Sequence, residues 1–313
     1  MSRKPRILLL VDYRGLSHEI NARGMMALLG DRYDFTLARL AEAPDLAGCA
    51  LDLAIVFFWG APVDRHAIPR ARLARVVASH RWHHPYFGVA DTAAFVDRYL
   101  ADAAHVLAVS RRLVDELSPH RPARWFPFGV DPAVFCPPPA RSGPVRIGWS
   151  GRIADPSKGV IDVLRPAAGD DIPLVLADGD VPHAEMPAFY QGIDVLTIAS
   201  ESEGGPIPLI EAMACGCFPV TVDVGIVPEL VRHGRDGLIV PREPGAFREA
   251  FEWCLAHPDA VRAAGQANAA RIRHERSWAA LRAPLVALLD ALLDATPPGR
   301  FTIPSTAPEE VKA

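Results

Sequence analysis

The sequence predicts an α/β protein of two domains, each built on a doubly wound, mostly parallel sheet. Three observations predict this fold class. Apolar runs of strand length alternate with helix-length amphipathic segments along most of the chain. The alternation stops once, at 131–144, a segment with five prolines and no periodic pattern. The 313 residues, 50% of them hydrophobic, are enough to fill two hydrophobic cores.

The first half of the chain contains five strand candidates separated by turns and helices. Strands are expected at 6–13, 33–40, 51–58, 74–79 and 105–110, and helices at 16–29, 91–103 and 111–117. Ser110 is expected to cap the last of these helices, because its hydroxyl can accept a hydrogen bond from a free N–H of the first turn.

The same rhythm restarts after the proline-rich segment. Strands are expected at 145–151, 173–178, 194–200, 218–223 and 237–240, with helices near 159–168, 184–191, 208–215 and 228–232 and further helix to about residue 293. The predicted organisation is a domain at 1–130, a linker at 131–144, a second domain at 145–295 and a disordered tail at 296–313. Open parallel sheets bind ligands beyond the carboxyl ends of their strands, so the expected site is a cleft between the domains.

Charge and cysteine content exclude several classes of protein. The formal net charge is -4 and the pI is about 6.3, which does not favour non-specific nucleic-acid binding. The five cysteines have irregular spacing and no zinc-site partners, so we expect reduced, mostly buried thiols of a cytoplasmic protein. The longest apolar stretch, 51–63, is too short to cross a bilayer, and the apolar run at the N-terminus is too short for a signal peptide.

The stretch 199-ASESEGGPIPLIEAMACG-216 is the strongest candidate for a ligand site. Its glycines allow close backbone approach to a ligand, and a helix that starts near Pro208 presents free N–H groups and the positive end of its dipole to a phosphate. Glu211 can accept hydrogen bonds from a ribose diol, and Glu203 from hydroxyls of a second ring. The alternative interpretation is an ordinary strand–loop–helix connection with acidic residues near the helix start. The candidate residues are Glu203, Gly204, Gly205, Pro206, Ile207 and Glu211.

This stretch resembles the E-x7-E signature of the retaining, GT-B-fold glycosyltransferases of family 4, also called glycosyl transferases group 1. It has the form Glu203-Gly-Gly-Pro-Ile-Pro-Leu-Ile-Glu211. The commoner form has an aromatic residue and a glycine where this chain has Gly205 and Pro206, which leaves one fewer backbone donor at Pro206. Further segments resemble the family in the expected order, at 129–135, 148–152, 158–159, 228–231, 234–240 and 277–278. The resemblance extends over 125–281 and is weak before it.

The resemblance implies a GT-B fold, with two Rossmann-like domains facing a central cleft, and a nucleoside-diphosphate-sugar donor. It implies that Arg152 and Lys158 grip the donor diphosphate, where two fixed cations can stabilise the leaving group. For Arg152 the alternative is an ordinary surface arginine. That alternative is weaker for Lys158, since lysine is rare in this chain. Asp170-Asp171 and Asp178-Gly-Asp180 are interpreted as a turn and a strand end, so we expect metal-independent transfer, with no metal site and no cofactor.

The resemblance gives fewer residues in the N-terminal half. Gly15, in the turn after the first strand, is carried over as a donor-binding residue. His80 follows the strand at 74–79 and matches the position of a family histidine near the transferred sugar. His83 and His84 are close competitors. Three histidines also suggest a metal site, but no carboxylate stands at ligand spacing in the sequence, and structural histidines are the plain alternative. The predicted catalytic residues are His80 and Glu203.

The segment 64–77 carries four arginines, at positions 65, 70, 72 and 75. We expect a solvated helix face, with contact to an anionic lipid surface or a phosphorylated acceptor as the alternative. A peripheral membrane contact at the inner face of the membrane is therefore possible for a cytoplasmic enzyme. The acceptor class stays open among a glycan, a lipid-linked glycan, a lipid and a small molecule.

Three function hypotheses follow. The first is a retaining glycosyltransferase of the hexosyltransferase type (EC 2.4), which family habit would place in polysaccharide biosynthesis. The second is a catalytically silent sugar-nucleotide-binding or scaffold protein, motivated by the weakly matching N-terminal half. The third, a nicotinamide oxidoreductase, is excluded because neither domain's first strand is followed by G-x-G-x-x-G.

Overall fold

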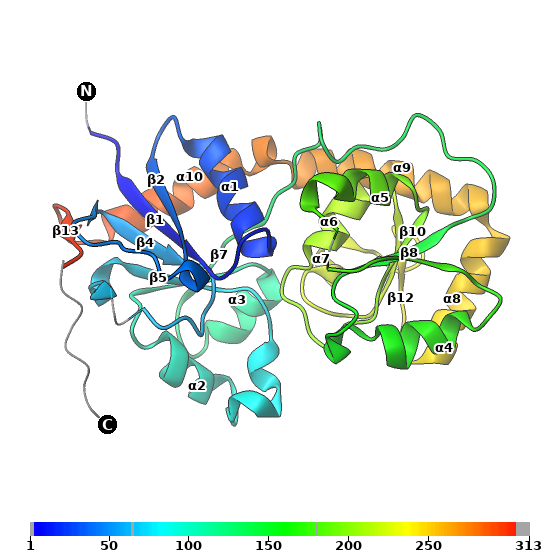
Figure 1. Ribbon diagram of the computed structural model, residues 1–313, viewed down its shortest axis with the longest axis horizontal. Helices are drawn as coiled ribbons and strands as arrows, with labels where there is room; N and C mark the ends of the chain where they lie inside the picture. The colour runs from blue at the N-terminus through cyan, green and yellow to red at the C-terminus, as the bar shows by residue number, and fades with distance from the viewer. Residues whose placement is uncertain (1–2, 64–65, 180, 305–313) are drawn as a thin grey trace. The chain divides into compact units, whose positions relative to one another are not determined.

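A computed structural model describes residues 3–63, 66–179 and 181–304 of the chain. The contacts between residues divide the protein into two compact units, Met1–Pro127 with Leu281–Ala313, and Phe128–Ala280. Each unit is an α/β structure around a parallel sheet, as the sequence predicts (Figure 1). The division differs from the predicted domain ending at 295, because the chain from Leu281 onward makes its contacts with the first unit.

The first unit contains a six-stranded sheet in the order β2-β1-β4-β5-β6-β7, with every pair parallel. The strands are β1 (Arg6–Val11), β2 (Asp34–Arg39), β4 (Leu53–Val56), β5 (Leu73–Val77), β6 (His105–Ala108) and β7 (Ala123–Trp125). In β1, Leu8 is in register with Thr36 on one side and Ala54 on the other. The side chains of residues 7–11 are fully buried, since helices and loops cover both faces of such a sheet.

Helices and short turns connect these strands. They are α1 (Ser17–Leu29), η1 (Leu40–Glu42), η3 (Arg70–Arg72), η4 (Arg81–His83), η5 (Pro85–Phe87), α2 (Thr92–Phe95), the π-helix η6 (Val96–Leu100) and α3 (Arg111–Leu117). Helix α10 (Trp278–Asp294) comes near the C-terminus, and from Leu281 onward it belongs to this unit. The Ser110 cap is confirmed, because its hydroxyl accepts a hydrogen bond from the Leu113 N–H at 3.2 Å. Tyr33, after α1, donates to Asp290 on α10 at 2.7 Å and ties the C-terminal helix to the first unit.

The expected disorder from residue 296 is wrong for the described part of the tail. β13 (Phe301–Thr302) pairs antiparallel with β3 (Ala50–Leu51), and Ile303 is buried. The Arg72 guanidinium donates to the Pro297 carbonyl at 2.8 Å. Apolar residues within a proline- and threonine-rich segment are therefore enough to dock it against β3 and the core of the first unit. Residues 305–313 lie outside the described part.

The expected solvated helix at 64–77 is also wrong. Arg72 lies in the short turn η3 and Arg75 in strand β5, and both are buried. Arg75 donates to Asp102 at 2.7 Å and to the Trp59 and Ala61 carbonyls. These two side chains satisfy buried acceptors inside the unit, so they are not available to a lipid surface. Arg65 lies outside the described residues.

The second unit contains a five-stranded parallel sheet in the order β12-β11-β10-β8-β9. The strands are β8 (Ile147–Ser150), β9 (Leu174–Ala177), β10 (Val195–Ile198), β11 (Phe218–Thr221) and β12 (Leu238–Ile239). The helical segments are η7 (Pro156–Lys158), the π-helix η8 (Val160–Leu164), α4 (Arg165–Ala168), η9 (His183–Glu185), α5 (Met186–Gln191), α6 (Ile207–Ala214), α7 (Val227–Leu230), α8 (Pro244–Ala256) and α9 (Pro258–Glu275).

The proline-rich segment 131–144 is fastened to the second unit by hydrogen bonds. The Arg141 guanidinium donates to the Cys215 carbonyl at 2.8 Å and to the Tyr190 carbonyl at 3.1 Å, and Gln191 donates to the Cys136 carbonyl at 3.0 Å. All five cysteines are free thiols. No helix within the described ranges is long and apolar enough to cross a membrane.

The contact of α6 with α9 depends on a glycine. A Cβ at Gly265 of α9 would lie 2.1 Å from the Gly216 carbonyl oxygen. We expect Gly265→Ala to lower the free energy of unfolding by about 1–3 kcal/mol, because the two segments would have to separate. Gly245→Ala is the matched control, since an added Cβ on α8 meets nothing within 4 Å. It should leave stability unchanged or raise it by about 0.5–1 kcal/mol. Urea-denaturation midpoints check both, and equal effects would contradict the packing argument.

Candidate active site

The candidate site of the second unit lies where the direction of the chain connections reverses. From β8 the chain passes to β9 on one side of β8 and then to β10 on its other side. Open parallel sheets bind ligands beyond the carboxyl ends of the strands at such a point. Arg152 and Lys158 follow β8, and the loop 201–206 follows β10, so the topology brings the two sequence motifs to one place.

The segments after β8 and β10 contact each other directly. The Glu201 N–H donates to the Ser157 carbonyl at 2.8 Å, and the Lys158 Nζ lies 2.5 Å from Glu203 Oε1. The side chains of this ion pair are only 28% and 15% exposed. Two of the predicted site residues are thus brought together, with the ammonium beside the start of the acidic loop. An anionic ligand at Lys158 would have to compete with the Glu203 carboxylate.

The position after Lys158 requires a glycine, Gly159, for two reasons. Its φ is +74°, a left-handed conformation that side chains disfavour, and a Cβ there would lie 2.4 Å from the Ala199 carbonyl oxygen. Only glycine lets the turn η7 pack against the end of β10. This close approach holds the Lys158 ammonium at the loop that carries Glu203.

The loop 203–206 is itself closely packed. Gly204 is buried, and a Cβ at Gly225, whose φ is +49°, would lie 2.5 Å from the Gly204 carbonyl oxygen. Helix α6 starts one residue before the expected Pro208, at Ile207, with Pro206 as its N-cap.

The start of α6 offers few backbone donors. Pro206 and Pro208 have no N–H, and the Leu209 N–H donates to the Pro206 carbonyl at 3.0 Å. A phosphate at this turn would have to use the N–H groups of Gly204, Gly205 and Ile207.

Arg152 lies on the other side of β8 from Lys158. A Cβ at Gly179, in the loop after β9, would lie 2.9 Å from the Arg152 Cγ, and the Ile153 N–H donates to Asp178 at 2.9 Å. Lys158 contacts the loop after β10, so the two expected diphosphate ligands lie toward different neighbours of β8. Among the described residues, no ion pair or hydrogen bond of the Arg152 side chain is recorded. Asp180, next to this loop, lies outside the described residues.

Glu211 lies in the second turn of α6 and is buried, with only 4% of its surface exposed. The His183 Nε2 lies 2.5 Å from Glu211 Oε1. The His183 ring in turn packs against Phe135, with ring centroids 5.4 Å apart. Glu211 is thus placed at the expected helix, but its carboxyl group is covered by a histidine that the sequence did not single out.

Burial raises the pKa of Glu211 above its ordinary value of 4.5, although the hydrogen bonds from His183 and Tyr190 oppose this. Burial also raises the pKa of Tyr190, whose hydroxyl lies 3.1 Å from Ser150 Oγ. The Glu211 carboxyl group therefore keeps its proton to a higher pH than a solvated glutamate does. Its hydrogen bonds join α6 to η9 through His183 and to α5 through Tyr190.

Gly15, the donor-binding residue expected in the first unit, lies in the turn between β1 and α1. Its φ is +73°, and its N–H donates to Glu19 Oε2 at 2.6 Å. An added Cβ would meet nothing within 4 Å, so its backbone conformation, and not crowding, requires glycine. Guanidinium groups of Arg39 and Arg23 also contact Glu19. Burial raises the pKa of Glu19, but these hydrogen bonds outweigh burial and lower the pKa to about 2.

His80 follows β5 and is paired with Glu116 on α3. The His80 Nε2 lies 2.7 Å from Glu116 Oε2, and the His83 Nε2 lies 3.0 Å from Glu116 Oε1. Thr92 donates to the same carboxylate at 3.0 Å. Burial raises the pKa of Glu116, but the hydrogen bonds from the two histidines outweigh burial and lower the pKa to about 2. His84, the third candidate, accepts a hydrogen bond from the Tyr86 N–H instead.

Sequence reasoning missed both partners of these candidate residues. Glu116 stands 36 positions from His80, and His183 stands 28 positions from Glu211. Glu116 follows β6, the neighbour of the strand β5 before His80, and His183 follows β9, which is separated only by β8 from the strand β10 before Glu211. Strand order was therefore the signal that could have found them. Within the described residues, no group of three or more His, Cys, Asp or Glu side chains is arranged to hold a metal ion.

Residues 175–271 match the model of the family Glycosyl transferases group 1. Similar curated proteins include the MMP alpha-(1->4)-mannosyltransferase of Mycolicibacterium hassiacum, 27% identical over 312 residues, which covers 86% of this chain and 73% of that protein. The D-inositol 3-phosphate glycosyltransferase of Thermobifida fusca is 29% identical over 134 residues, 42% of this chain. That alignment spans only 30% of the relative.

Solved structures that cover most of the chain resemble it in fold. Sucrose-phosphate synthase from Thermosynechococcus elongatus has a TM-score of 0.69 at 16% identity, covering 94% of this chain and 100% of that chain. HepE from Anabaena, in complex with UDP and glucose, has a TM-score of 0.68 at 16% identity, covering 91% and 99%.

The His80–Glu116 pair predicts a pH-dependent contribution to stability. The pKa of Glu116 is lowered from 4.5 to about 2, so its contribution is present above pH 4.5 and is lost as the pH falls toward 2. We expect Glu116→Gln to lower the free energy of unfolding by about 1–3 kcal/mol near pH 5, with the difference shrinking below pH 4.5. Urea titrations at several pH values measure this.

Asp115→Asn is the control, because Asp115 is exposed on the same helix. A stability difference for Glu116→Gln that stays constant across this pH range would contradict the pairing.

Proposed function

We propose that this glycosyltransferase, which has the GT-B fold, transfers a hexosyl group from a nucleoside-diphosphate sugar with retention of configuration and without a bound metal ion. The observation that carries the proposal is the contact of Lys158 with Glu203, 2.5 Å apart, at the switch point of the second sheet. A cation, a glycine-rich turn and a buried carboxyl group on α6 gather there. Each could bind a different part of a sugar nucleotide.

The diphosphate would rest near Lys158 and the N–H groups of the turn before α6. As the bond between the anomeric carbon and the diphosphate oxygen breaks, its electron pair stays on the diphosphate, whose negative charge grows. Lys158 stabilises that charge once a donor has drawn it away from Glu203. The freed Glu203 carboxylate then accepts hydrogen bonds from sugar hydroxyls. Arg152 approaches the diphosphate from the side of β9. Its long side chain carries a planar guanidinium whose N–H groups can donate to phosphate oxygens.

The nucleoside would contact Glu211. Ribose hydroxyls can donate to its carboxyl oxygens, and they take the place of the His183 ring nitrogen that occupies one oxygen now. We propose the first unit as the acceptor side, and Gly15 and the paired His80 there follow β1 and β5. His80, oriented by Glu116, is proposed to hydrogen-bond the transferred sugar.

The donor base and the sugar are the next choices. HepE is described in complex with UDP and glucose, and a relative from Mycobacterium tuberculosis, 25% identical over 294 residues, is named as GDP-mannose-dependent. Uridine and guanosine donors are therefore the first to compare, and the acceptor comes from a panel of glycans, lipid-linked glycans, lipids and small phosphorylated molecules. Donor binding without transfer or hydrolysis would favour the alternative, a silent sugar-nucleotide-binding or scaffold protein.

A nucleoside diphosphate should stabilise the folded protein. At roughly 100 times its Kd, a ligand adds about 2.7 kcal/mol to the free energy of unfolding, so UDP or GDP should raise the melting temperature by several degrees. We expect Lys158→Ala to weaken diphosphate affinity by about tenfold or more, because a charge-assisted contact is lost. Arg248→Ala is the control, since Arg248 forms an exposed pair with Asp171 away from the loop. Thermal-shift titrations measure both, and equal affinities would place the diphosphate elsewhere.

Turnover tests the buried carboxyl group. We expect Glu211→Ala to reduce kcat/KM for donor hydrolysis and transfer by about 100-fold or more, because the ribose contact and the alignment of α6 are lost together. Glu201→Ala is the matched control. Glu201 is exposed in the loop that precedes α6, and its ion pair with Arg242 is long, at 3.6 Å. Circular dichroism verifies that both variants fold. Unchanged turnover in Glu211→Ala would refute transfer at this site.

A further inference from the structure

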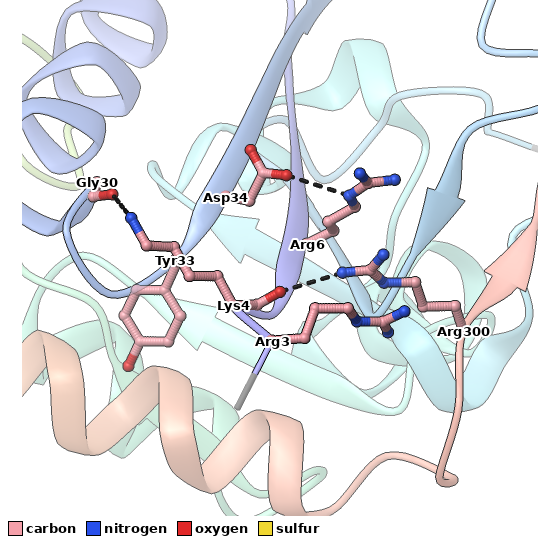
Figure 2. A pocket seen from close by; sticks show the side chains of 7 residues that line it. All are labelled: Arg3, Lys4, Arg6, Gly30, Tyr33, Asp34 and Arg300. Atoms are coloured by element: carbon pink, nitrogen blue, oxygen red, sulfur yellow. Dashed lines mark hydrogen bonds and ion pairs between the residues drawn. The ribbon is translucent and has the colours of Figure 1, made fainter. Parts of the chain in front are cut away.

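A cationic region lies in the first unit, and none of the residues discussed as donor ligands lines it. A cavity of about 190 Å³ is lined by Arg3, Lys4, Arg6, Gly30, Tyr33, Asp34 and Arg300 (Figure 2). Arg6 and Asp34 are the first residues of β1 and β2, so the cavity lies at the amino ends of these strands. The candidate residues of the first unit, in contrast, follow the carboxyl ends of β1 and β5.

Two distant parts of the chain build this cavity. The pairing of β13 with β3 brings Arg300 beside the residues that precede β1. The Arg300 guanidinium donates to Asp52 at 3.0 Å and to the Lys4 carbonyl at 3.1 Å. The Arg300 side chain is only 11% exposed in its pair with Asp52. The docked C-terminal segment therefore holds Arg300 in place at the cavity.

The cavity carries an excess of positive charge. Four cationic side chains line it together with Asp34, and Asp52, which is not a lining residue, pairs with Arg3 and Arg300. Four positive and two negative charges leave a local net charge of +2, in a chain whose formal net charge is -4. Like charges held this close repel each other, so a dianion would relieve the repulsion.

The cationic side chains have more N–H donors than their bonds within the protein use, so donors remain for a ligand. Figure 2 shows the guanidinium groups of Arg3, Arg6 and Arg300 on one side of the cavity, while Lys4 reaches the Gly30 carbonyl at 2.9 Å. Arg6 contacts Asp34 through Nε at 3.1 Å. Each guanidinium has five N–H donors in a planar fork, which fits two oxygens of one phosphate.

We propose that this cavity binds a phosphate monoester dianion, with Arg3 and Arg6 as its principal ligands. Its volume is smaller than the roughly 300–1,000 Å³ of sites that enclose a whole small molecule, so it fits a phosphate group and leaves the rest of the ligand outside. The phosphate belongs either to a free phosphorylated metabolite or to a lipid head group. The proposal does not depend on the donor site.

Inorganic phosphate is the probe for the cavity. Isothermal titration at constant ionic strength, with chloride as the balancing ion, should detect phosphate binding to the full chain. The double variant Arg3→Gln/Arg6→Gln should weaken it by about tenfold or more, because two charge-assisted contacts are lost. Both side chains are about half exposed or more, so the variant should fold, which the melting temperature verifies. Asp34→Asn should tighten binding, since it removes a competing anion and releases Arg6.

Two further variants distinguish this cavity from other phosphate sites. Loss of phosphate binding in Lys158→Gln but not in the double variant would put the phosphate in the donor site and overturn the proposal. Equal losses in the double variant and in Arg248→Gln would show screening only and overturn it as well. Absence of phosphate binding to the unmodified chain would also overturn it.

Vesicles identify the source of the phosphate. Vesicles of phosphatidylcholine with phosphatidic acid, a phosphate monoester, are compared by co-sedimentation with vesicles of equal charge that contain phosphatidylglycerol, a diester. Preference for phosphatidic acid that the double variant loses supports a lipid head group. Phosphate binding in solution without this preference supports a free phosphorylated metabolite.

Discussion

The close approach of the turn η7 to the end of β10 is the constraint on which the candidate site depends. Gly159 adopts a left-handed conformation against the Ala199 carbonyl, where any side chain would collide. This contact fixes Lys158 beside Glu203, and the pair joins the two segments that leave the switch point of the sheet. Without that approach, a lysine after β8 and a glutamate after β10 would be two surface charges on separate loops. The sheet topology brings the two loops to the switch point, and Gly159 allows them to pack against each other there.

The buried Glu211 adds a second constraint, since a carboxyl group inside a protein needs partners. His183 and Tyr190 supply them. A ribose could replace one partner without leaving the carboxyl group unsatisfied, because its hydroxyls donate as the imidazole does. Ligand binding would then exchange hydrogen bonds inside the unit and would not require an uncompensated polar group at any step.

Local patterns predicted most elements of the fold, because the buried parallel strands are continuous apolar runs and the helices carry recognisable start signals such as Ser110. The docked tail was missed because Phe301 and Ile303 are isolated apolar residues, whose partner strand β3 is two residues long. The buried roles of Arg72 and Arg75 were missed for a related reason, since composition does not reveal which carbonyls a guanidinium will satisfy. Glu203, Glu211 and Lys158 could be named from a motif, but Glu116 and His183 became visible only when strand order was known.

The cavity in the first unit and the site in the second would attract anions by different means. At the carboxyl ends of parallel strands helices begin, so free N–H groups already favour negative charge and a single lysine can be enough. At the amino ends helices finish, and their last carbonyls favour positive charge, as the contact of Lys4 with Gly30 at the end of α1 illustrates. An anion site on that edge has to be built from side-chain cations, and Arg3, Lys4, Arg6 and Arg300 supply the excess that the backbone there cannot.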